Sequence, residues 1–267
     1  MKSIMSGMLC IGMTLACVGI QAEPVQSQWK GKKVAFLGDS ITDKNHIGTT
    51  KNYWNYLPEF LGIESLVYGI NGEQMSGILA QAKRLKAEHP DDVDAIFVFA
   101  GTNDFNGGIP LGSWWTLGKE EVNSHGRIMT KERRKLNKDM GTFCGRINAV
   151  MEYLRQEFPL QQIVLMTPIH RGFATFGGDN IQPEESFPND IGIYLESYVE
   201  MLRQAADIWA VNLIDLYRVS GLHPLTSSHG GFFNNRETDL LHPNAQGHYR
   251  IARAMMYQML AMPADFK

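Results

Sequence analysis

The chain has 267 residues, of which 44% are hydrophobic and 20% are charged, a balance typical of a soluble globular protein with a sizeable core. A formal net charge of −3 gives no electrostatic reason to expect binding to nucleic acid or to an anionic membrane surface. The net charge likewise gives no reason to expect a cofactor that needs a strongly cationic binding site.

The first 22 residues have the pattern of a secretory signal peptide. Lys2 gives a positive start, residues 4–20 carry no charge, and Ala22 precedes a polar segment. We therefore expect cleavage after Ala22 and export to the periplasm or the exterior. An alternative is a lipoprotein anchored through Cys17, although Thr14 stands where such processing sites usually carry leucine. No later segment is long enough to span a membrane.

Cleavage would remove Cys10 and Cys17 and leave Cys144 as the only cysteine. One cysteine cannot form an internal disulfide, so the exported protein must depend on its core for stability. Cys144 lies in a helix-like pattern, and we interpret it as a small buried apolar residue.

After the signal peptide, short apolar runs alternate with amphipathic stretches, which predicts strands that alternate with helices. The expected strands are 33–37, 65–70, 95–100, 162–167 and 210–214, and the expected helices are 53–61, 75–88, 137–157, 194–209 and 245–262. This alternation predicts a single α/β domain over residues 23–267, a three-layer α/β/α sandwich with a central five-stranded parallel sheet, flavodoxin-like.

Two long stretches show no regular pattern, 105–134 and 171–191. Loops of this length in a compact domain are usually lids or binding loops, or else mobile. Within the first stretch and just beyond it, the charge run "KERRK" at 131–135 is most simply the solvated start of a helix.

Glycine-containing polar turns follow the first three expected strands. They read "GDSI" at 38–41, "GINGE" at 69–73 and "GTND" at 101–104. In open parallel sheets, ligands bind outside the carboxyl ends of the strands, so the three turns should share one edge. Near the C-terminus, "TDLLHPNAQGH" places Asp239 three residues before His242, just ahead of the last helix.

These residues are the set that acyl transfer requires. The Ser40 hydroxyl needs a base, which His242 can supply, and a carboxylate such as Asp239 would orient that histidine. The developing oxyanion needs preset donors. We expect these to be the N–H of Ser40, at the start of a helix, the N–H of Gly72 and the side-chain amide of Asn103.

The order GDSI, glycine turn, GTND and DxxH resembles the SGNH, or GDSL-type, hydrolase family. The likeness spans Lys33 to roughly Met262, which is nearly the whole chain after the signal peptide. It implies that Ser40, Gly72, Asn103 and His242 take the four name-giving roles, with Asp239 supporting the histidine, in a carboxylic ester hydrolase. The sequence departs from the family pattern after Gly72, where Glu73 replaces the more usual small residue or aspartate.

Each of these residues also has a structural interpretation. Ser40 could be a turn residue, Asn103 could cap a helix, a task better suited to Asp104, and His242 could lie in an exposed loop. We interpret His248 as structural, and five further histidines lack an identifiable partner: His46, His89, His125, His223 and His229. No His, Cys or Asp cluster has metal-ligand spacing, so neither a metal nor another cofactor is expected.

The substrate elements are expected in the long loops. Trp114 and Trp115 in the first loop, and His170 at the start of the second, are candidates to line the cleft, together with Arg171, Phe173 and Phe176. Aromatic side chains suit sugar rings, acyl chains and aryl groups alike.

We expect removal of acetyl or other short acyl groups from a small-molecule or oligosaccharide ester. The alternatives are a lipid-directed esterase or lysophospholipase, and a non-catalytic glycan-binding protein on the same fold. The oligomeric state is not indicated by the sequence.

Overall fold

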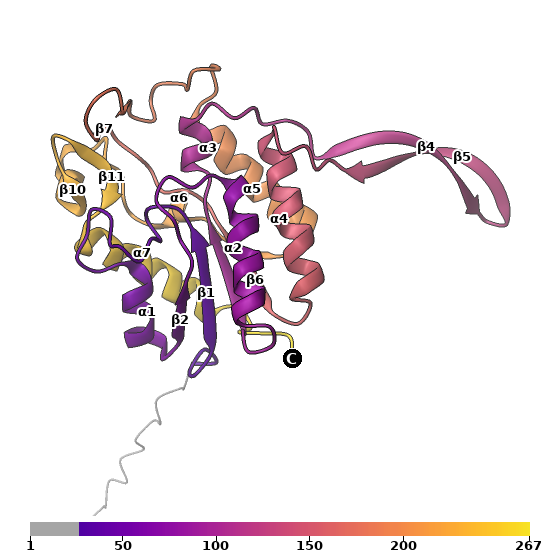
Figure 1. Ribbon diagram of the computed structural model, residues 1–267, viewed down its shortest axis with the longest axis horizontal. Coiled ribbons are helices and arrows are strands. Elements are labelled where there is room, and N and C mark those ends of the chain that lie inside the picture. The colour runs from indigo at the N-terminus through magenta and orange to yellow at the C-terminus, as the bar shows by residue number, and fades with distance from the viewer. Residues whose placement is uncertain (1–26) are drawn as a thin grey trace, which may run out of the picture.

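The computed structural model describes residues 27–267, and its centre is a five-stranded sheet in the order β2-β1-β3-β6-β9 (Figure 1). All neighbouring strands are parallel. Their bounds are β1 (Lys33–Gly38), β2 (Glu64–Val67), β3 (Ala95–Phe99), β6 (Gln162–Met166) and β9 (Asn212–Ile214). Each expected strand is present with small shifts at its ends, and the parallel α/β fold is confirmed.

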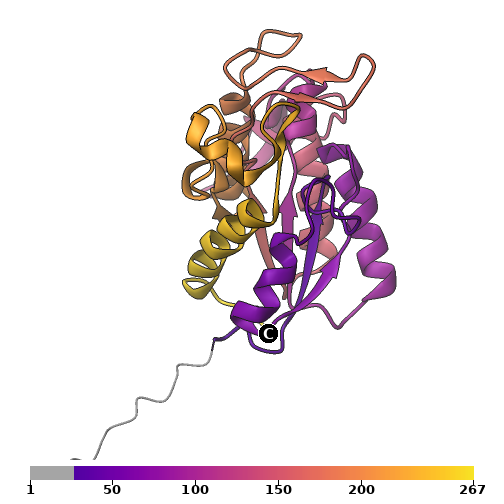
Figure 2. The same cartoon turned by 90° about the vertical axis from the view of Figure 1, so that its left-hand side faces the viewer.

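Helices cover both faces of the sheet. The helices on one face are α1 (Tyr53–Leu61) and α7 (Ala245–Leu260), and those on the other are α2 (Met75–Glu88), α4 (Phe143–Glu157) and α5 (Leu195–Trp209) (Figures 1 and 2). Because side chains alternate along a strand, β1 contributes to both cores. Val34 and Phe36 pack in the α1/α7 core, whereas Ala35 and Leu37 pack in the α2/α4/α5 core.

A second, antiparallel sheet lies beside the carboxyl end of the central one, and the sequence patterns did not indicate it. Its order is β10-β11-β7-β8, and its strands are β7 (Ala174–Thr175), β8 (Ile181–Gln182), β10 (Phe233–Asn235) and β11 (Asp239–Pro243). Ala174 of β7 is the register partner of Asp239 of β11. This pairing connects the segment 171–191, expected to be irregular, to the strand that carries Asp239 and His242.

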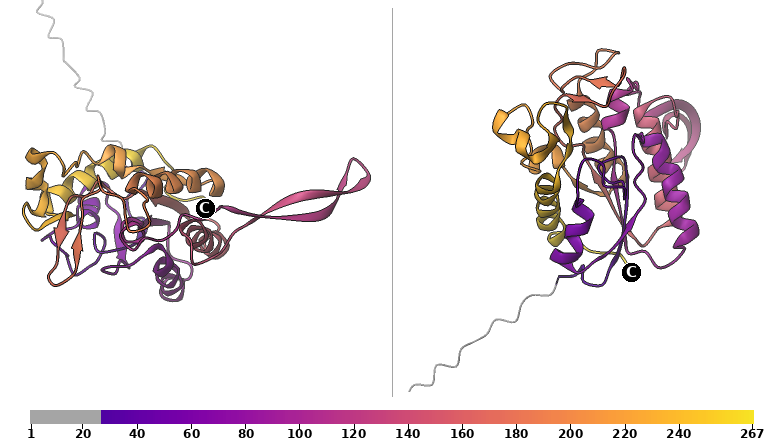
Figure 3. Two further views of the ribbon diagram at one scale, coloured as in Figure 1. Left: turned by 90° about the horizontal axis from the view of Figure 1, so that it is seen from above. Right: turned by 60° about the vertical axis from the view of Figure 1, so that its left-hand side comes forward.

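Residues 105–134 do not form the expected irregular loop. After the short helix α3 (Thr102–Asn106), strands β4 (Trp115–Ser124) and β5 (Arg127–Leu136) form a two-stranded hairpin that projects from the body (Figures 1 and 3). The turn residues His125 and Gly126 both have positive φ, 54° and 78°, as a two-residue hairpin turn requires. The expected helix start at 131–135 is therefore wrong, since these residues belong to β5.

The remaining short elements are α6 (Leu216–Val219) and the 3₁₀ helix η1 (Ser227–Phe232). No helix within residues 27–267 combines the length and the hydrophobicity that crossing a membrane requires. The predicted signal peptide and Cys17 lie outside the described residues.

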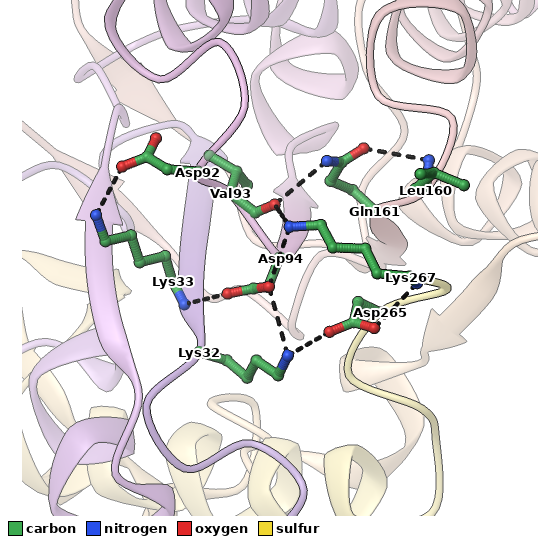
Figure 4. A network of polar contacts seen from close by, with 9 residues as sticks. All are labelled: Lys32, Lys33, Asp92, Val93, Asp94, Leu160, Gln161, Asp265 and Lys267. Atoms are coloured by element: carbon green, nitrogen blue, oxygen red, sulfur yellow. Dashed lines mark hydrogen bonds and ion pairs between the residues drawn. The ribbon is translucent and has the colours of Figure 1, made fainter.

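A network of ion pairs lies at the amino end of the sheet, opposite the edge that carries the polar turns (Figure 4). Lys32 pairs with both Asp94 and Asp265, and Lys267 Nζ lies 3.3 Å from Asp94 Oδ1. The backbone N–H of Lys33 also donates to Asp94 at 2.9 Å. The C-terminal residues are thus attached to the starts of β1 and β3, and the carboxyl edge is left free for a site.

Candidate active site

Ser40 lies in a tight turn directly after β1. The N–H of Ile41 donates to Asp39 Oδ1 at 3.0 Å, and the N–H of Thr42 donates to the Asp39 carbonyl oxygen at 3.0 Å. The strand ends on Gly38 because a Cβ there would lie 2.7 Å from the carbonyl oxygen of Phe99. The expected helix at Ser40 is absent: the turn leads into a loop, and the next helix, α1, begins at Tyr53.

The Ser40 hydroxyl, His242 and Asp239 form a continuous chain of polar contacts. Ser40 Oγ lies 2.9 Å from His242 Nε2, and His242 Nδ1 lies 3.0 Å and 3.2 Å from the two carboxylate oxygens of Asp239. All three residues are buried, with exposed fractions of 3–4%. A histidine with one nitrogen at a serine hydroxyl and the other at a carboxylate is placed to accept the hydroxyl proton.

Asp239 is held as a carboxylate by the groups around it. Burial alone would raise its pKa, but the hydrogen bond and charge of His242, the N–H of His242 and the amide of Asn234 together bring the pKa below its ordinary value. Asn234 Nδ2 donates to Asp239 Oδ2 at 2.9 Å, and the N–H groups of Leu241 and His242 donate to Oδ1. No sequence pattern indicates Asn234, which the β10–β11 pairing brings to the carboxylate.

The second and third polar turns meet beside the first. Asn71 N–H donates to Asp43 Oδ2 at 2.8 Å, which joins the second turn to the segment after Ser40. Asn103 Nδ2 donates to the carbonyl oxygen of Glu73 at 2.9 Å. Gly72 has a φ of +77°, a conformation that favours glycine. Within residues 27–267, the N–H groups of Ser40 and Gly72 donate to no protein acceptor.

Asp104 has a structural position. It is fully buried, its Oδ2 accepts the N–H of Met75 at 2.8 Å, and its Oδ1 lies 2.8 Å from Arg146 Nη1. It therefore connects α3 to the start of α2 and to α4. His248 is also internal: its Nδ1 accepts the N–H of Tyr53 at 3.2 Å, and burial lowers its pKa to about 3.

The structure places the three expected substrate residues as follows. Trp114 packs at the base of the hairpin, where its Nε1 donates to Gln204 at 2.9 Å. Trp115 is the first residue of β4, with the Arg134 guanidinium over its ring. The His170 ring packs at a tilt against the Tyr217 ring, and its Nδ1 lies 2.5 Å from Glu185 Oε1. None of the three has a described contact with Ser40, Asp239 or His242 within the part of the chain that the structure covers, so their substrate role stays a prediction.

Two residues of the segment 171–191 have defined contacts with the body of the protein. The Phe176 ring lies 5.3 Å from the His242 ring in an edge arrangement, and 43% of Phe176 is exposed. Arg171 is buried and donates to Thr102 and Gln182, and burial lowers its pKa to about 10. Phe176 thus presents a partly exposed ring beside His242, whereas Arg171 connects the segment to α3.

A cavity of about 240 Å³ lies between the end of α3 and the segment 171–191. Its walls carry both polar and apolar side chains. They are Phe105, Asn106, Asp179, Asn180, Ile181, Gln182, Pro183, Phe187, Pro188, Asn189 and Asp190.

Solved structures share this fold. One is a protein from Lactobacillus plantarum, with 28% identity over 87% of this chain and 98% of the other and a TM-score of 0.68. A possible lipase from Chitinophaga pinensis has 21% identity, coverages of 85% and 96% and a TM-score of 0.62. A member of the lipolytic protein G-D-S-L family from Veillonella parvula has 14% identity, coverages of 85% and 97% and a TM-score of 0.55.

No curated protein matches the sequence. The model of the GDSL-like lipase/acylhydrolase family, however, matches residues 36–250, which include Ser40, Gly72, Asn103, Asp239 and His242. This match covers well over half of the chain, and the chain therefore belongs to the GDSL-like lipase/acylhydrolase family.

Proposed function

We propose that the protein is a serine esterase that cleaves carboxylic esters through an acyl-enzyme. The observation that carries this proposal is the chain from Ser40 Oγ to His242 Nε2, at 2.9 Å, and from His242 Nδ1 to Asp239, at 3.0 Å. Ser40 is the nucleophile, His242 the general base, and Asp239 the group that fixes the imidazole orientation and stabilises the imidazolium.

The reaction follows from these positions. Ser40 Oγ attacks the ester carbonyl carbon while its proton passes to His242 Nε2, and the imidazolium then protonates the leaving alcohol. Water enters by the same route: His242 removes its proton, the water oxygen attacks the acyl carbon, and Ser40 Oγ leaves with the proton. Each half-reaction returns the histidine to its neutral form.

The proposed oxyanion donors are the N–H of Ser40, the N–H of Gly72 and the amide of Asn103. The first two donate to no described protein group. Asn103 uses one of its two amide hydrogens on Glu73, so the second remains for a ligand. Donors fixed by three connected turns suit the stabilisation of a charge that appears only during reaction.

The proposed substrate is a short acyl ester, in the first place an acetyl ester, of a carbohydrate. The cavity beside α3 supports this proposal, because its lining includes the amide of Asn106 and the carboxylates of Asp179 and Asp190, groups that hydrogen-bond sugar hydroxyls. Phe176, half exposed beside His242, offers an aromatic surface for a sugar ring.

A lipid-directed esterase is the second candidate, and one observation favours it. The segment 171–191 exposes several large apolar side chains: Phe173, Phe176, Ile181, Phe187 and Ile191. Such a surface suits an acyl chain as well as a sugar ring. A series of p-nitrophenyl esters from acetyl to palmitoyl, measured beside acetylated xylo- and chito-oligosaccharides, separates the two substrates.

The enzyme assignment is tested by Ser40→Ala. We expect loss of p-nitrophenyl acetate hydrolysis and of labelling by a fluorophosphonate probe, with an unchanged thermal midpoint. Retained hydrolysis in Ser40→Ala would refute the serine nucleophile. Absence of labelling and of turnover in the unaltered protein would instead favour a non-catalytic glycan-binding protein.

A further inference from the structure

A second group of chemically active side chains lies outside the proposed catalytic residues. His170, Glu185 and His223 each point one ligand atom into a shared space, and these atoms all lie within 4.8 Å of one another. His170 follows β6, Glu185 lies between β8 and α5, and His223 follows α6. Among residues 27–267 this is the only such set of three histidine, cysteine or acidic side chains.

Neighbouring groups already orient two of the three ligands. Glu185 Oε2 accepts the N–H of Arg171 at 3.0 Å, which leaves Oε1 directed at His170 Nδ1, 2.5 Å away. His223 Nδ1 shares a 2.9 Å hydrogen bond with Thr226 Oγ1, so its Nε2 is free for a ligand. Ligand histidines in metal sites typically use their second nitrogen in this way.

The third ligand is fixed by packing. The His170 ring lies with its centroid 3.7 Å from that of Tyr217, and the His223 ring lies at 4.9 Å from the His170 ring. Glu185 is only 4% exposed, whereas His223 is exposed. The group therefore has a buried carboxylate at its base and an imidazole at its mouth.

We propose that His170, Glu185 and His223 form a Zn²⁺ site with three protein ligands and a fourth position open to water. Two imidazoles and one carboxylate match the donors that Zn²⁺ takes in such sites, whereas Ca²⁺ and Mg²⁺ require oxygen ligands. Ligands of a tetrahedral Zn²⁺ lie roughly 3.4 Å apart for bonds of about 2.0–2.1 Å. Binding therefore moves the exposed His223 inward and separates His170 Nδ1 from Glu185 Oε1, which lie 2.5 Å apart. Binding displaces the proton that His170 Nδ1 shares with Glu185, and the metal-bound neutral imidazole carries its single proton on Nε2.

The ion would act on the substrate side of the molecule without taking part in ester cleavage. Glu185 belongs to the segment 171–191, which also carries Phe176 beside His242. His170 and His223 belong to the segments that follow the carboxyl ends of the central strands. Zn²⁺ would therefore cross-link the segment 171–191 to the body of the protein.

The test is a zinc titration of protein purified without a histidine tag and freed of metal with a chelator. Calorimetry should give one Zn²⁺ per chain, and the thermal midpoint should rise with Zn²⁺ concentration because only the folded state holds the site. Mg²⁺ at the same concentrations should change neither signal. Zinc affinity should fall by at least about tenfold in His170→Ala and in His223→Ala.

The matched control is His89→Ala. His89 also pairs with a carboxylate, at 3.0 Å from Asp92, but it belongs to no three-membered group in the part of the chain that the structure describes. Its removal should therefore leave zinc binding unchanged. His223→Ala should retain p-nitrophenyl acetate hydrolysis in metal-free buffer. Zinc binding that survives in His223→Ala but disappears in His242→Ala would place the ion at the catalytic histidine and overturn the proposal, as would no binding to the unaltered protein.

Discussion

Asn234 and His242 approach the same carboxylate oxygen of Asp239, at 2.9 Å and 3.0 Å. The amide therefore donates to the same oxygen that faces the imidazole and helps to fix the orientation of the carboxylate. Asn234 is a positioning residue that acts through Asp239.

Asn234→Ala should lower kcat for p-nitrophenyl acetate roughly tenfold with little change in KM, since a hydrogen bond to a charged group contributes about 1.5–3 kcal/mol. Because the Asn234 amide helps to lower the pKa of Asp239, the acidic limb of the pH–rate profile should also move to higher pH. Asn235→Ala is the control, as its side chain accepts hydrogen bonds within the β10–β11 turn and has none to Asp239. Equal effects of both variants would reject the positioning role.

Asp39 should make the folded state less stable as pH rises toward neutrality. Burial raises its pKa to about 7, so between about pH 4 and pH 7 the folded state holds a proton that the unfolded state has released. The free energy of unfolding should therefore decrease with rising pH in this window, by at most about 1.4 kcal/mol per pH unit for one group.

Asp39→Asn removes the titrating carboxyl group, so the free energy of unfolding of the variant should fall less steeply between about pH 4 and pH 7. Urea unfolding of both proteins at pH 5, 6, 7 and 8 measures the difference. Parallel pH dependences for the variant and the unaltered protein would show that Asp39 titrates in its ordinary range.

The Arg146–Asp104 ion pair should be critical to stability. Asp104 is fully buried, the Arg146 side chain is only 11% exposed, and the atoms lie 2.8 Å apart. Arg146→Met leaves a buried carboxylate without its cation and should cost about 3–5 kcal/mol of unfolding free energy at pH 7.

The double variant Arg146→Met/Asp104→Asn should recover part of that loss. Lys138→Met is the surface comparison, because the Lys138 and Glu152 side chains are 49% and 31% exposed, and pairs of this kind contribute about 0–1 kcal/mol. Denaturant unfolding should show a clearly larger loss of unfolding free energy in Arg146→Met than in Lys138→Met. Similar losses in the two variants would contradict the structural role of the Arg146–Asp104 pair.

The β4–β5 hairpin should be removable. Asn137 N–H donates to the carbonyl oxygen of Trp114 at 2.9 Å, so the chain enters and leaves the hairpin at adjacent points. Replacing residues 115–136 by a short Gly-Ser turn should preserve the thermal midpoint and the hydrolysis of p-nitrophenyl acetate. Lost aryl-ester activity would connect the hairpin to the catalytic residues, and a selective loss of oligosaccharide turnover would support the predicted substrate contact of Trp115.

The central sheet was predictable from the sequence because its strands are short runs of apolar residues. "AIFVF" in β3 is buried at every position, and such a run is readable without knowledge of its partners. The polar turns at Ser40, Gly72 and Asn103 were predictable for the same reason, since the ends of parallel strands share one edge. The helix expected at Ser40 was wrong because the Asp39 side chain closes a turn there.

The hairpin and the antiparallel sheet were not predictable from periodicity. Neither face of the hairpin is buried, so charged residues occupy both sides of β5 and no apolar alternation marks the strand. β7 and β8 have two residues each, too few to show a period. Asn234 and the His170–Glu185–His223 group depend on contacts between distant segments, which residue spacing along one chain does not contain.

The pairing of Ala174 with Asp239 has a consequence for protein engineering. Libraries that vary the segment around Phe176 to admit bulkier esters will also shift the strand that bears the catalytic acid and base. Gains in substrate range should then come with slower turnover, unless compensating changes in β10 restore the imidazole alignment.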